Sequence, residues 1–463
     1  MRLTVIGCGY LGAVHAAAMA ELGHHVLGIE TDPARLEPLA QGESPFYEPG
    51  LDELLRRGAQ EGRLRYADGP SPAELAGAAV HFLAVGTPQS SSGHGTELGY
   101  LWEAVDALVA ALPRRRHLAE LPLVVGKSTV PVGTAARVAD RLAGRALVVW
   151  NPEFLREGTA VADTLRPDRL VYGLPARAAQ AARARALLDE VYIELLVAGV
   201  PRLEMDYQTA ELVKTAANSF LATKISFINA MSSMCAATGA DVTVLADAIG
   251  RDERIGGQFL RAGIGFGGGC LPKDLRGLRA RAAELGVTEL ASFLDGVDSI
   301  NRGQRDSVTR MALDALGSDP AGRTVTVLGI TFKPGSDDLR DSPALEVALR
   351  LADAGADVVV HDPKGLPALP DLHPALRAQP SMLEALEGAD LVVLGTEWAE
   401  LTALDPRVAA RRVARRVIID ARNALVPAQW TEAGWDYRGI GRSRSPQRRR
   451  TPTTRPCVGT MVG

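Results

Sequence analysis

One cysteine of this chain stands where a glycine-rich loop is expected to pass into a helix. Residues 265–274 read Gly-Phe-Gly-Gly-Gly-Cys-Leu-Pro-Lys-Asp, so the thiol is Cys270. Free N–H groups at a helix start and the positive end of the helix dipole stabilise a thiolate. Pro272 suits a first helical turn, and Asp274 falls on the same face as Cys270. The pattern predicts a nucleophile that ionises readily; the alternative is a glycine-rich turn followed by an inert buried thiol.

Three polar motifs each follow a short apolar run that predicts a strand. The runs 80–85, 123–126 and 146–150 are succeeded by Gly86-Thr87-Pro88, by Lys127 to Thr134 and by Asn151 to Thr159. In a doubly wound parallel sheet, ligands bind beyond the carboxyl ends of the strands. We therefore expect the three motifs to form one edge of a site.

The first residues carry a glycine fingerprint between a strand and a helix. Leu3 to Ile6 predicts a strand, Gly7-Cys8-Gly9-Tyr10-Leu11-Gly12 reads G-x-G-x-x-G, and an alanine-rich helical stretch follows. A second predicted strand, 25–29, ends at Glu30, 18 residues beyond Gly12. An acid in that position binds a ribose 2′-hydroxyl, which favours NAD over NADP.

The rest of the chain divides into a helical part and a second α/β pattern. Residues 205–238 predict one long helix, and 241–300 predict shorter helices interrupted by the glycine-rich region. A strand and turn restart at 324–329, and buried strands are predicted at 358–360, 391–394 and 417–419. The expected fold class is α/β, with two Rossmann-like doubly wound domains joined by a long central helix and a small helical domain. The predicted units are residues 1–200, 201–300, 301–440 and a disordered basic tail, 441–463.

Composition limits the classes of protein to which the chain can belong. Its 463 residues are 46% hydrophobic and 23% charged, and no long apolar stretch predicts a membrane span. The net charge is −4, but residues 441–463 hold six of the 51 basic residues and no acid, so the body carries −10. An acidic body argues against nucleic acid as a partner. We expect a cytoplasmic protein, whose tail is either merely solvated or a tether to RNA or to an anionic surface.

The cysteines and histidines give no sign of a metal site. Cys8, Cys235, Cys270 and Cys457 form no CxxC pair and have no histidine at ligand spacing, so reduced thiols and no metal are expected. His81 has no partner motif and is interpreted as a strand-edge residue rather than a catalyst.

Taken in order, six motifs resemble those of the nucleotide-sugar 6-dehydrogenase family. They are Gly7 to Gly12, Lys127 to Thr134, Asn151 to Thr159, Glu211 to Asn218, the decapeptide around Cys270, and Phe332 to Pro343. The resemblance covers residues 1 to about 440. It departs from the common pattern at Gly269, where many members have serine, and at Leu271, where many have phenylalanine.

The resemblance implies a role for each matching residue. The implied catalytic set is Cys270, Lys214, Asn218, Asp274, Glu153 and Thr129. The implied NAD-binding set is Gly7, Gly9, Tyr10, Leu11, Gly12, Glu30, Arg35, Thr87, Thr129, Glu157, Lys273 and Arg340. The implied substrate-binding set is Phe154, Leu155, Glu157, Lys214, Asn218, Arg254, Arg261, Phe266, Gly267, Lys333 and Arg422, with Arg254 acting across a dimer.

The implied reaction is the four-electron oxidation of UDP-glucose to UDP-glucuronate with NAD as cofactor. A cysteine suits it, because an aldehyde loses a second hydride only after a nucleophile has added to its carbonyl. GDP-mannose and UDP-N-acetyl-mannosamine remain alternative substrates. A catalytically silent NAD- or nucleotide-sugar-binding protein is the alternative of another class.

Overall fold

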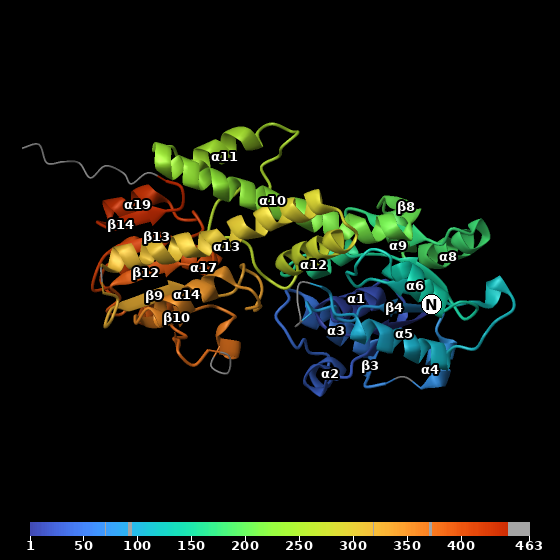
Figure 1. The fold of residues 1–463 in the computed structure, drawn as a ribbon. Helices are drawn as coiled ribbons and strands as arrows, with labels where there is room; N and C mark the ends of the chain where they lie inside the picture. The colour runs from blue at the N-terminus through green and yellow to red at the C-terminus, as the bar shows by residue number, and fades with distance from the viewer. Residues whose placement is uncertain (70, 91–94, 318, 370–372, 443–463) are drawn as a thin grey trace, which may run out of the picture.

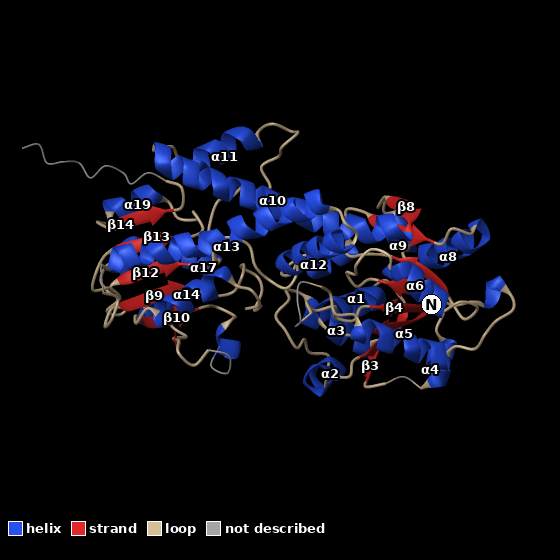
Figure 2. Cartoon of the chain, in the orientation of Figure 1, coloured by secondary structure: helices blue, strands red, loops and turns tan. Residues whose placement is uncertain are grey.

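Two α/β lobes are joined by a pair of long helices (Figure 1; Figure 2). The computed structural model describes residues 1–69, 71–90, 95–317, 319–369 and 373–442. In this part of the chain, no helix is both long and apolar enough to cross a membrane.

The first lobe is built on an eight-stranded sheet in the order β3-β2-β1-β4-β5-β6-β7-β8. The first six strands of that order are parallel, while β7 meets β6 in antiparallel fashion. The strands are β1 (Arg2–Ile6), β2 (His25–Ile29), β3 (Leu64–Ala67), β4 (Val80–Leu83), β5 (Leu123–Gly126), β6 (Leu147–Trp150), β7 (Leu170–Leu174) and β8 (Arg202–Asp206).

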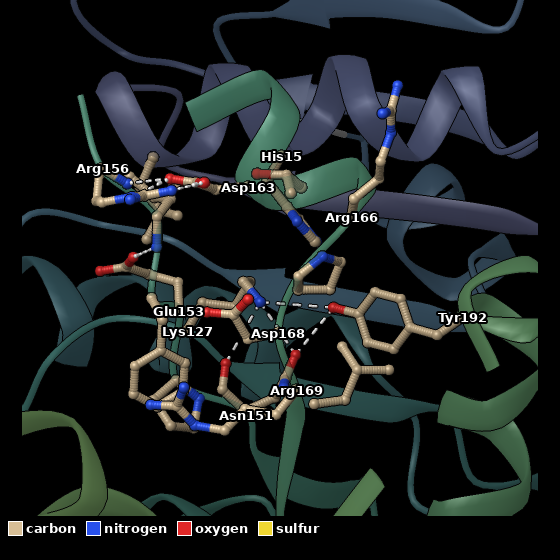
Figure 3. Close-up of a pocket in the computed structure, with 17 residues that line it drawn as sticks. His15, Lys127, Asn151, Glu153, Arg156, Asp163, Arg166, Asp168, Arg169 and Tyr192 are labelled. Carbon is tan, nitrogen blue, oxygen red and sulfur yellow. Dashed lines mark hydrogen bonds and ion pairs between the residues drawn. The ribbon is translucent and has the colours of Figure 1, made fainter. Parts of the chain in front are cut away.

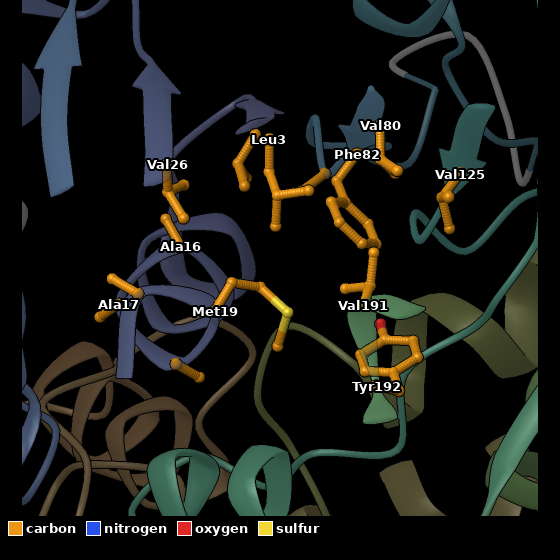
Figure 4. Close-up of a cluster of buried hydrophobic side chains, with 14 of the residues drawn as sticks. Leu3, Ala16, Ala17, Met19, Val26, Val80, Phe82, Val125, Val191 and Tyr192 are labelled. Carbon is orange, nitrogen blue, oxygen red and sulfur yellow. The ribbon is translucent and has the colours of Figure 1, made fainter. Parts of the chain in front are cut away.

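Helices cover both faces of this sheet. They are α1 (Tyr10–Glu21), α2 (Pro33–Ala40), α3 (Leu51–Gln60), α4 (Pro72–Gly77), α5 (Gly99–Ala111), η1 (Leu118–Glu120), α6 (Thr134–Arg141), α7 (Ala160–Leu165), α8 (Ala178–Val191) and α9 (Ile193–Val197). The alanines of α1 let it lie close against the strands, and Met19 packs in one core with Leu3, Phe82 and Tyr192 (Figure 4). Close packing at this position fixes the glycine turn that precedes α1.

A pair of long helices connects the lobes. Helix α10 (Tyr207–Thr238) begins at Asp206, whose side chain accepts a hydrogen bond from the Thr209 N–H. It ends at Gly239, which has a φ of 78°. Helices α11 (Val242–Gly250) and α12 (Leu271–Glu284) follow, and then α13 (Thr288–Leu316). The 29-residue length of α13 shows that the expectation of only short helices up to residue 300 was wrong.

The second lobe contains a six-stranded, wholly parallel sheet in the order β11-β10-β9-β12-β13-β14. Its strands are β9 (Thr324–Leu328), β10 (Asp357–His361), β11 (Arg377–Ala378), β12 (Leu391–Leu394), β13 (Val417–Asp420) and β14 (Asp436–Gly439). Its helices are α14 (Pro343–Asp353), η2 (Leu366–Ala368), α16 (Met382–Ala385), α17 (Ala399–Thr402), α18 (Pro406–Ala409) and α19 (Pro427–Glu432). The C-terminal half of α13 packs on this sheet through Val308 and Ala312.

The predicted fold class is confirmed, with two corrections of detail. His81 is fully buried in the interior strand β4, where its Nδ1 lies 2.8 Å from the Thr4 hydroxyl, so it is not a strand-edge residue. Of the predicted tail, Gly441 and Arg442 are ordered, since the Val242 N–H donates to the Gly441 carbonyl and Arg442 pairs with Asp241. Residues 443–463 lie outside the described part of the chain.

Candidate active site

Cys270 occupies the N-cap of helix α12, as its sequence context predicts. The Asp274 N–H donates to the Cys270 carbonyl at 2.9 Å, which closes the first turn, and Pro272 lies buried inside that turn. Cys270 keeps accessible surface at the site rather than lying in a packed core, although protein atoms surround its thiol closely. The inert-thiol interpretation therefore does not fit its position.

The predicted ease of ionisation is wrong for this conformation. Burial by the surrounding protein and, after it, the charge of Glu153 raise the pKa of the Cys270 thiol from 9.0 to about 12. Lys214 acts in the opposite direction and lowers this pKa. The helix start is outweighed because desolvation and a nearby carboxylate both disfavour a thiolate.

Lys214 and Glu153 form a buried ion pair between helix α10 and the loop after β6. Lys214 Nζ lies 2.8 Å from Glu153 Oε1, and the two side chains are 5% and 12% exposed. Glu153 also accepts a hydrogen bond of 2.7 Å from the Leu155 N–H. Burial alone would lower the pKa of Lys214, but the charges of Glu153 and Asp274 outweigh it and raise that pKa, so the lysine stays cationic.

Asn218 lies one turn after Lys214 on α10 and reaches Asp274 of α12. Its Nδ2 donates to Asp274 Oδ2 at 2.6 Å, and Lys273 Nζ lies 2.9 Å from the other oxygen of that carboxylate. Thr129, in the loop after β5, lines a small pocket together with Lys273 and Asp274. Packing of α10 against α12 thus brings Lys214, Asn218 and Asp274 together. The charges of Glu153, Lys214 and Asp274 all act on the Cys270 thiol, and Thr129 lies on the Asp274 side of this cluster.

The glycine turn of the first lobe has the geometry of a dinucleotide cradle. Gly7 has a φ of +87°, and a Cβ at Gly12 would come within 1.8 Å of the Gly7 carbonyl oxygen. The Glu30 carboxylate, buried at the end of β2, accepts a hydrogen bond of 3.1 Å from the Cys8 N–H. An acid fixed above such a turn suits a ribose diol, and Arg35 Nη1 lies 3.7 Å from it. The residues present therefore fit an NAD molecule.

Glu157 joins the two lobes. Its carboxylate accepts a hydrogen bond of 2.8 Å from the Ser336 hydroxyl, and its carbonyl accepts one of 2.6 Å from Lys333 Nζ. Burial raises the pKa of Glu157 to about 7, and the charge of Asp338 adds to this although Arg340 and Lys333 oppose it. The Arg340 guanidinium lies over Gly269, where a Cβ would come within 2.6 Å of the guanidinium carbon unless this exposed side chain moved.

A second cavity, of about 260 Å³, lies where the central helices meet the second lobe. It is lined by residues of the predicted substrate set: Arg261, Phe266, Gly267, Lys333 and Arg422. Arg422 has its donors engaged, with hydrogen bonds to the carbonyls of Gly395, Gly265 and Phe332. Arg254 does not reach this cavity within one chain; its side chain is 89% exposed and pairs with Asp252.

The sequence pattern missed two residues that shape the site. Arg169 lies with its guanidinium carbon 3.9 Å from the centre of the Phe154 ring, whose centre is 5.7 Å from Lys214 Nζ. Buried Glu48 accepts hydrogen bonds from the Gly158 and Ala160 N–H groups at 2.6 and 2.7 Å. No local signal marks either residue, since Glu48 acts on a loop 110 residues away.

The whole chain is similar to a known enzyme family. Its three segments match the UDP-glucose/GDP-mannose dehydrogenase family: the NAD binding domain over residues 1–196, the central domain over 208–303 and the UDP binding domain over 326–427. UDP-glucose 6-dehydrogenase of Rhizobium meliloti is 38% identical over 447 residues, which is 96% of this chain and 100% of that protein.

Solved structures of nucleotide-sugar dehydrogenases are similar to this chain over nearly its whole length. A UDP-glucose dehydrogenase of Pyrobaculum islandicum superposes with a TM-score of 0.84 at 34% identity, covering 95% of this chain and 98% of that one. A UDP-D-ManNAc dehydrogenase of Pyrococcus horikoshii superposes with a TM-score of 0.82 at 25% identity, covering 96% and 100%.

Proposed function

The chain belongs to the UDP-glucose/GDP-mannose dehydrogenase family and is an NAD-dependent nucleotide-sugar dehydrogenase; from this premise we propose that it oxidises UDP-glucose to UDP-glucuronate. The observation that carries the proposal is the cluster of Cys270, Lys214, Glu153, Asn218 and Asp274 at the junction of α10 and α12. The name of the Rhizobium meliloti relative supports UDP-glucose as the substrate.

The first lobe is the proposed holder of NAD. The glycine turn 7–12 receives the diphosphate, and Glu30 receives the adenosine ribose. Arg35, Thr87, Thr129, Glu157, Lys273 and Arg340 complete the proposed set. When bound, the cofactor supplies the acceptor for the hydride lost in each of the two oxidations.

Cys270 is the proposed nucleophile of the second oxidation. The thiolate adds to the C6 aldehyde and gives a thiohemiacetal, and loss of hydride from that adduct leaves a thioester. Lys214 and Asn218, one turn apart on α10, stabilise the oxyanion that develops at the C6 oxygen. The cationic state of Lys214 supports this role, because a neutral amine would offer much weaker stabilisation.

Hydrolysis of the thioester requires a water molecule and a base. We assign Glu153 as the base and Asp274 as the residue that orders the water, with Thr129 as a hydrogen-bonding partner. Release of the carboxylate restores the Cys270 thiol for the next turnover.

The 260 Å³ cavity is the proposed nucleotide-sugar site. Lys333 and Arg261 are the cations placed to meet the diphosphate, and Phe266 and Gly267 form one wall. Arg422 holds the wall through its carbonyl contacts. Phe154 and Leu155 are proposed to contact the sugar beside Lys214.

A homodimer built on α10 completes the proposal. Phe220, Phe227 and Met234 recur every seven residues on α10 and are 66%, 52% and 58% exposed. Seven residues are two helical turns, so the three side chains form one apolar stripe. In such a dimer, the exposed Arg254 of one subunit is proposed to reach the nucleotide-sugar site of the other. Phe227→Glu is expected to convert a dimer into a monomer in analytical ultracentrifugation.

The test of the function is turnover of purified protein with NAD+ and each of UDP-glucose, GDP-mannose and UDP-N-acetyl-mannosamine. Two NADH per UDP-glucose, with an acidic product, is the expected result, and Cys270→Ser should abolish product acid. The superposition on the Pyrococcus horikoshii enzyme is the observation in favour of UDP-N-acetyl-mannosamine as the second candidate. Absence of NADH with all three would favour a silent binding protein.

A further inference from the structure

A cavity of about 80 Å³ lies behind Glu153; we call it the rear chamber. Its walls come from α1, from the loop and helix 151–164, from residues 166–170, and from Lys127 and Tyr192 (Figure 3). Neither Lys214 nor Cys270 lines it. Glu153 is thus the residue that belongs both to the rear chamber and to the catalytic cluster, through its ion pair with Lys214.

The inner end of the rear chamber is polar although it is deeply buried. Lys127 Nζ lies 3.0 Å from Asn151 Oδ1, and Tyr192 donates its hydroxyl to the same oxygen at 2.8 Å (Figure 3). Lys127 is 6% exposed, and within the described residues its hydrogen-bond partners are neutral oxygens rather than carboxylates. The ammonium has two longer contacts as well, 3.4 Å to the Asn151 carbonyl and 3.5 Å to the Tyr192 hydroxyl. Its short contact is with a neutral amide oxygen, so the buried cation faces the cavity without a carboxylate partner in the described part of the chain.

His15 adds a second unsatisfied polar group. Its Nε2 atom is buried and has no hydrogen-bond partner among the described residues, and the ring packs edge-on against Phe82 with centroids 4.4 Å apart. Buried polar atoms are normally satisfied by protein or by ordered water. A polar cavity of 80 Å³ has room for several water molecules.

The outer end of the rear chamber reaches the protein surface. Arg156, Arg166 and Asp168 line it and are exposed, and Arg156 is held at 2.6 Å by Asp163. The cavity therefore connects buried Lys127 and Glu153 at one end with solvent at the other.

The proposed reaction creates a need for such a connection. One alcohol, two NAD+ and one water give one carboxylate, two NADH and three protons, so each turnover consumes a water molecule and releases three protons. In the proposed function, the sugar and the nicotinamide lie beside Lys214 and Cys270, on the side of Glu153 that faces away from the rear chamber. Glu153, as the base of hydrolysis, must pass its proton on before the next turnover.

We propose that the rear chamber holds a chain of water molecules that supplies the hydrolytic water to the Cys270 thioester and carries the proton from Glu153 to the surface, an inference that rests on the function proposed above. The water beside Glu153 attacks the thioester carbon while Glu153 takes its proton. The C–S bond breaks and the sulfur leaves as the thiolate. The proton then moves along water molecules held by Lys127, Tyr192 and His15 to the exposed rim. These three are positioning residues, since they act through water and touch no reacting atom.

The test uses full-length protein with UDP-glucose and NAD+ under rapid quench. Thr164→Met fills the rear chamber from α7, and Tyr192→Phe removes one hydroxyl while keeping the ring. Ala162→Met on the exposed side of the same helix is the matched control. Stopped-flow absorbance reports the first NADH, and mass spectrometry of the quenched Cys270 peptide reports the thioester.

The expected result separates the two halves of the reaction. Thr164→Met and Tyr192→Phe should leave the first NADH phase unchanged and slow acid release by about 10- to 100-fold, so that the thioester accumulates on Cys270. Ala162→Met should behave as wild type. The solvent deuterium isotope effect on hydrolysis should rise in Thr164→Met, which a merely structural defect would not cause.

Two outcomes would overturn the proposed role of the rear chamber. One is wild-type hydrolysis in both chamber variants; the other is an equal slowing of both phases, which indicates general damage to the site. If the wild-type protein itself forms no NADH from UDP-glucose, the proposed function fails first, and the two failures are therefore distinguishable.

Discussion

The ionisation of Cys270 can be tested without any substrate. We predict that the free protein alkylates at Cys270 much more slowly than a simple thiol, and that two substitutions shift the rate in opposite directions. Glu153→Gln removes the charge that most opposes ionisation, so it should lower the thiol pKa and accelerate labelling. Lys214→Met removes the opposing cation, so it should raise the pKa and slow labelling.

The size of the effect follows from the thiol pKa of about 12 against an ordinary value of 9.0. Three pH units reduce the thiolate fraction at pH 8 by about 10³. Part of this loss in labelling rate is recovered, because a thiolate becomes more nucleophilic as the pKa of its thiol rises. The logarithm of its rate constant increases by about 0.4–0.5 per pKa unit. The net expectation is labelling roughly 30- to 60-fold slower than that of N-acetylcysteine.

The assay is iodoacetamide labelling from pH 6 to 11, with the Cys270 peptide quantified by mass spectrometry. Glu37→Gln, which changes an exposed glutamate of α2, is the control and should leave the profile unchanged. A labelling midpoint below about pH 8 in the wild-type protein would refute the reasoning, because burial would then not dominate this thiol.

Three further predictions concern other parts of the site. The raised pKa of Glu157, about 7 against an ordinary 4.5, means that the folded protein keeps a proton the unfolded chain has lost, so this group's stabilisation falls as pH rises from about 4.5 to 7. Relative to wild type, Glu157→Gln should therefore become more stable as the pH rises across that window, by up to about 3 kcal/mol in the free energy of unfolding. Calorimetry at successive pH values would show this as a rising difference in melting temperature, and parallel curves for the two proteins would contradict it. Gly12→Ala should weaken NAD binding by more than about 100-fold in titration calorimetry, because its Cβ would clash with the Gly7 carbonyl. An affinity equal to that of wild type would show that the turn can rearrange to accept the Cβ. Arg169→Met should raise the KM for nucleotide sugar about fivefold through the loss of about 1 kcal/mol of stacking on Phe154, with partial rescue in Arg169→Lys; an unchanged KM would show that the contact does not position the ring.

Local patterns in the sequence were enough to predict most of the architecture. The glycine turn, the strands β5 and β12 and the start of α12 follow from short apolar runs, glycine and proline. Strand β8 was not predicted, because its residues are mostly exposed and do not alternate between apolar and polar. Nothing in Arg202–Asp206 therefore distinguishes the strand from a loop. The full length of helix α13 was not predicted, because its buried side chains face different partners along the helix. They pack first on α10 and α12 and then on the second sheet.

For the site, residue identities were more predictable than their electrostatics. Lys214 and Asn218 are one turn apart on a helix, so their common face could be inferred from spacing alone. The pKa of Cys270 could not be inferred, because it depends on burial by the folded chain and on the charge of Glu153, which is distant in sequence. Arg422 likewise sits at the predicted strand end, but only the folded chain shows that its donors meet carbonyls of three separate loops.

The two lobes are connected by α10 and α13 lying side by side, and not by one flexible strand of chain. Paired helices interlock through their side-chain ridges, so twisting one lobe relative to the other would require those ridges to lift out of their grooves. Gentle bending of the pair is the soft motion that remains. We therefore expect any relative movement of the lobes to be a bend of this helix pair rather than a twist, so that Glu157 keeps its register with Ser336 and Lys333.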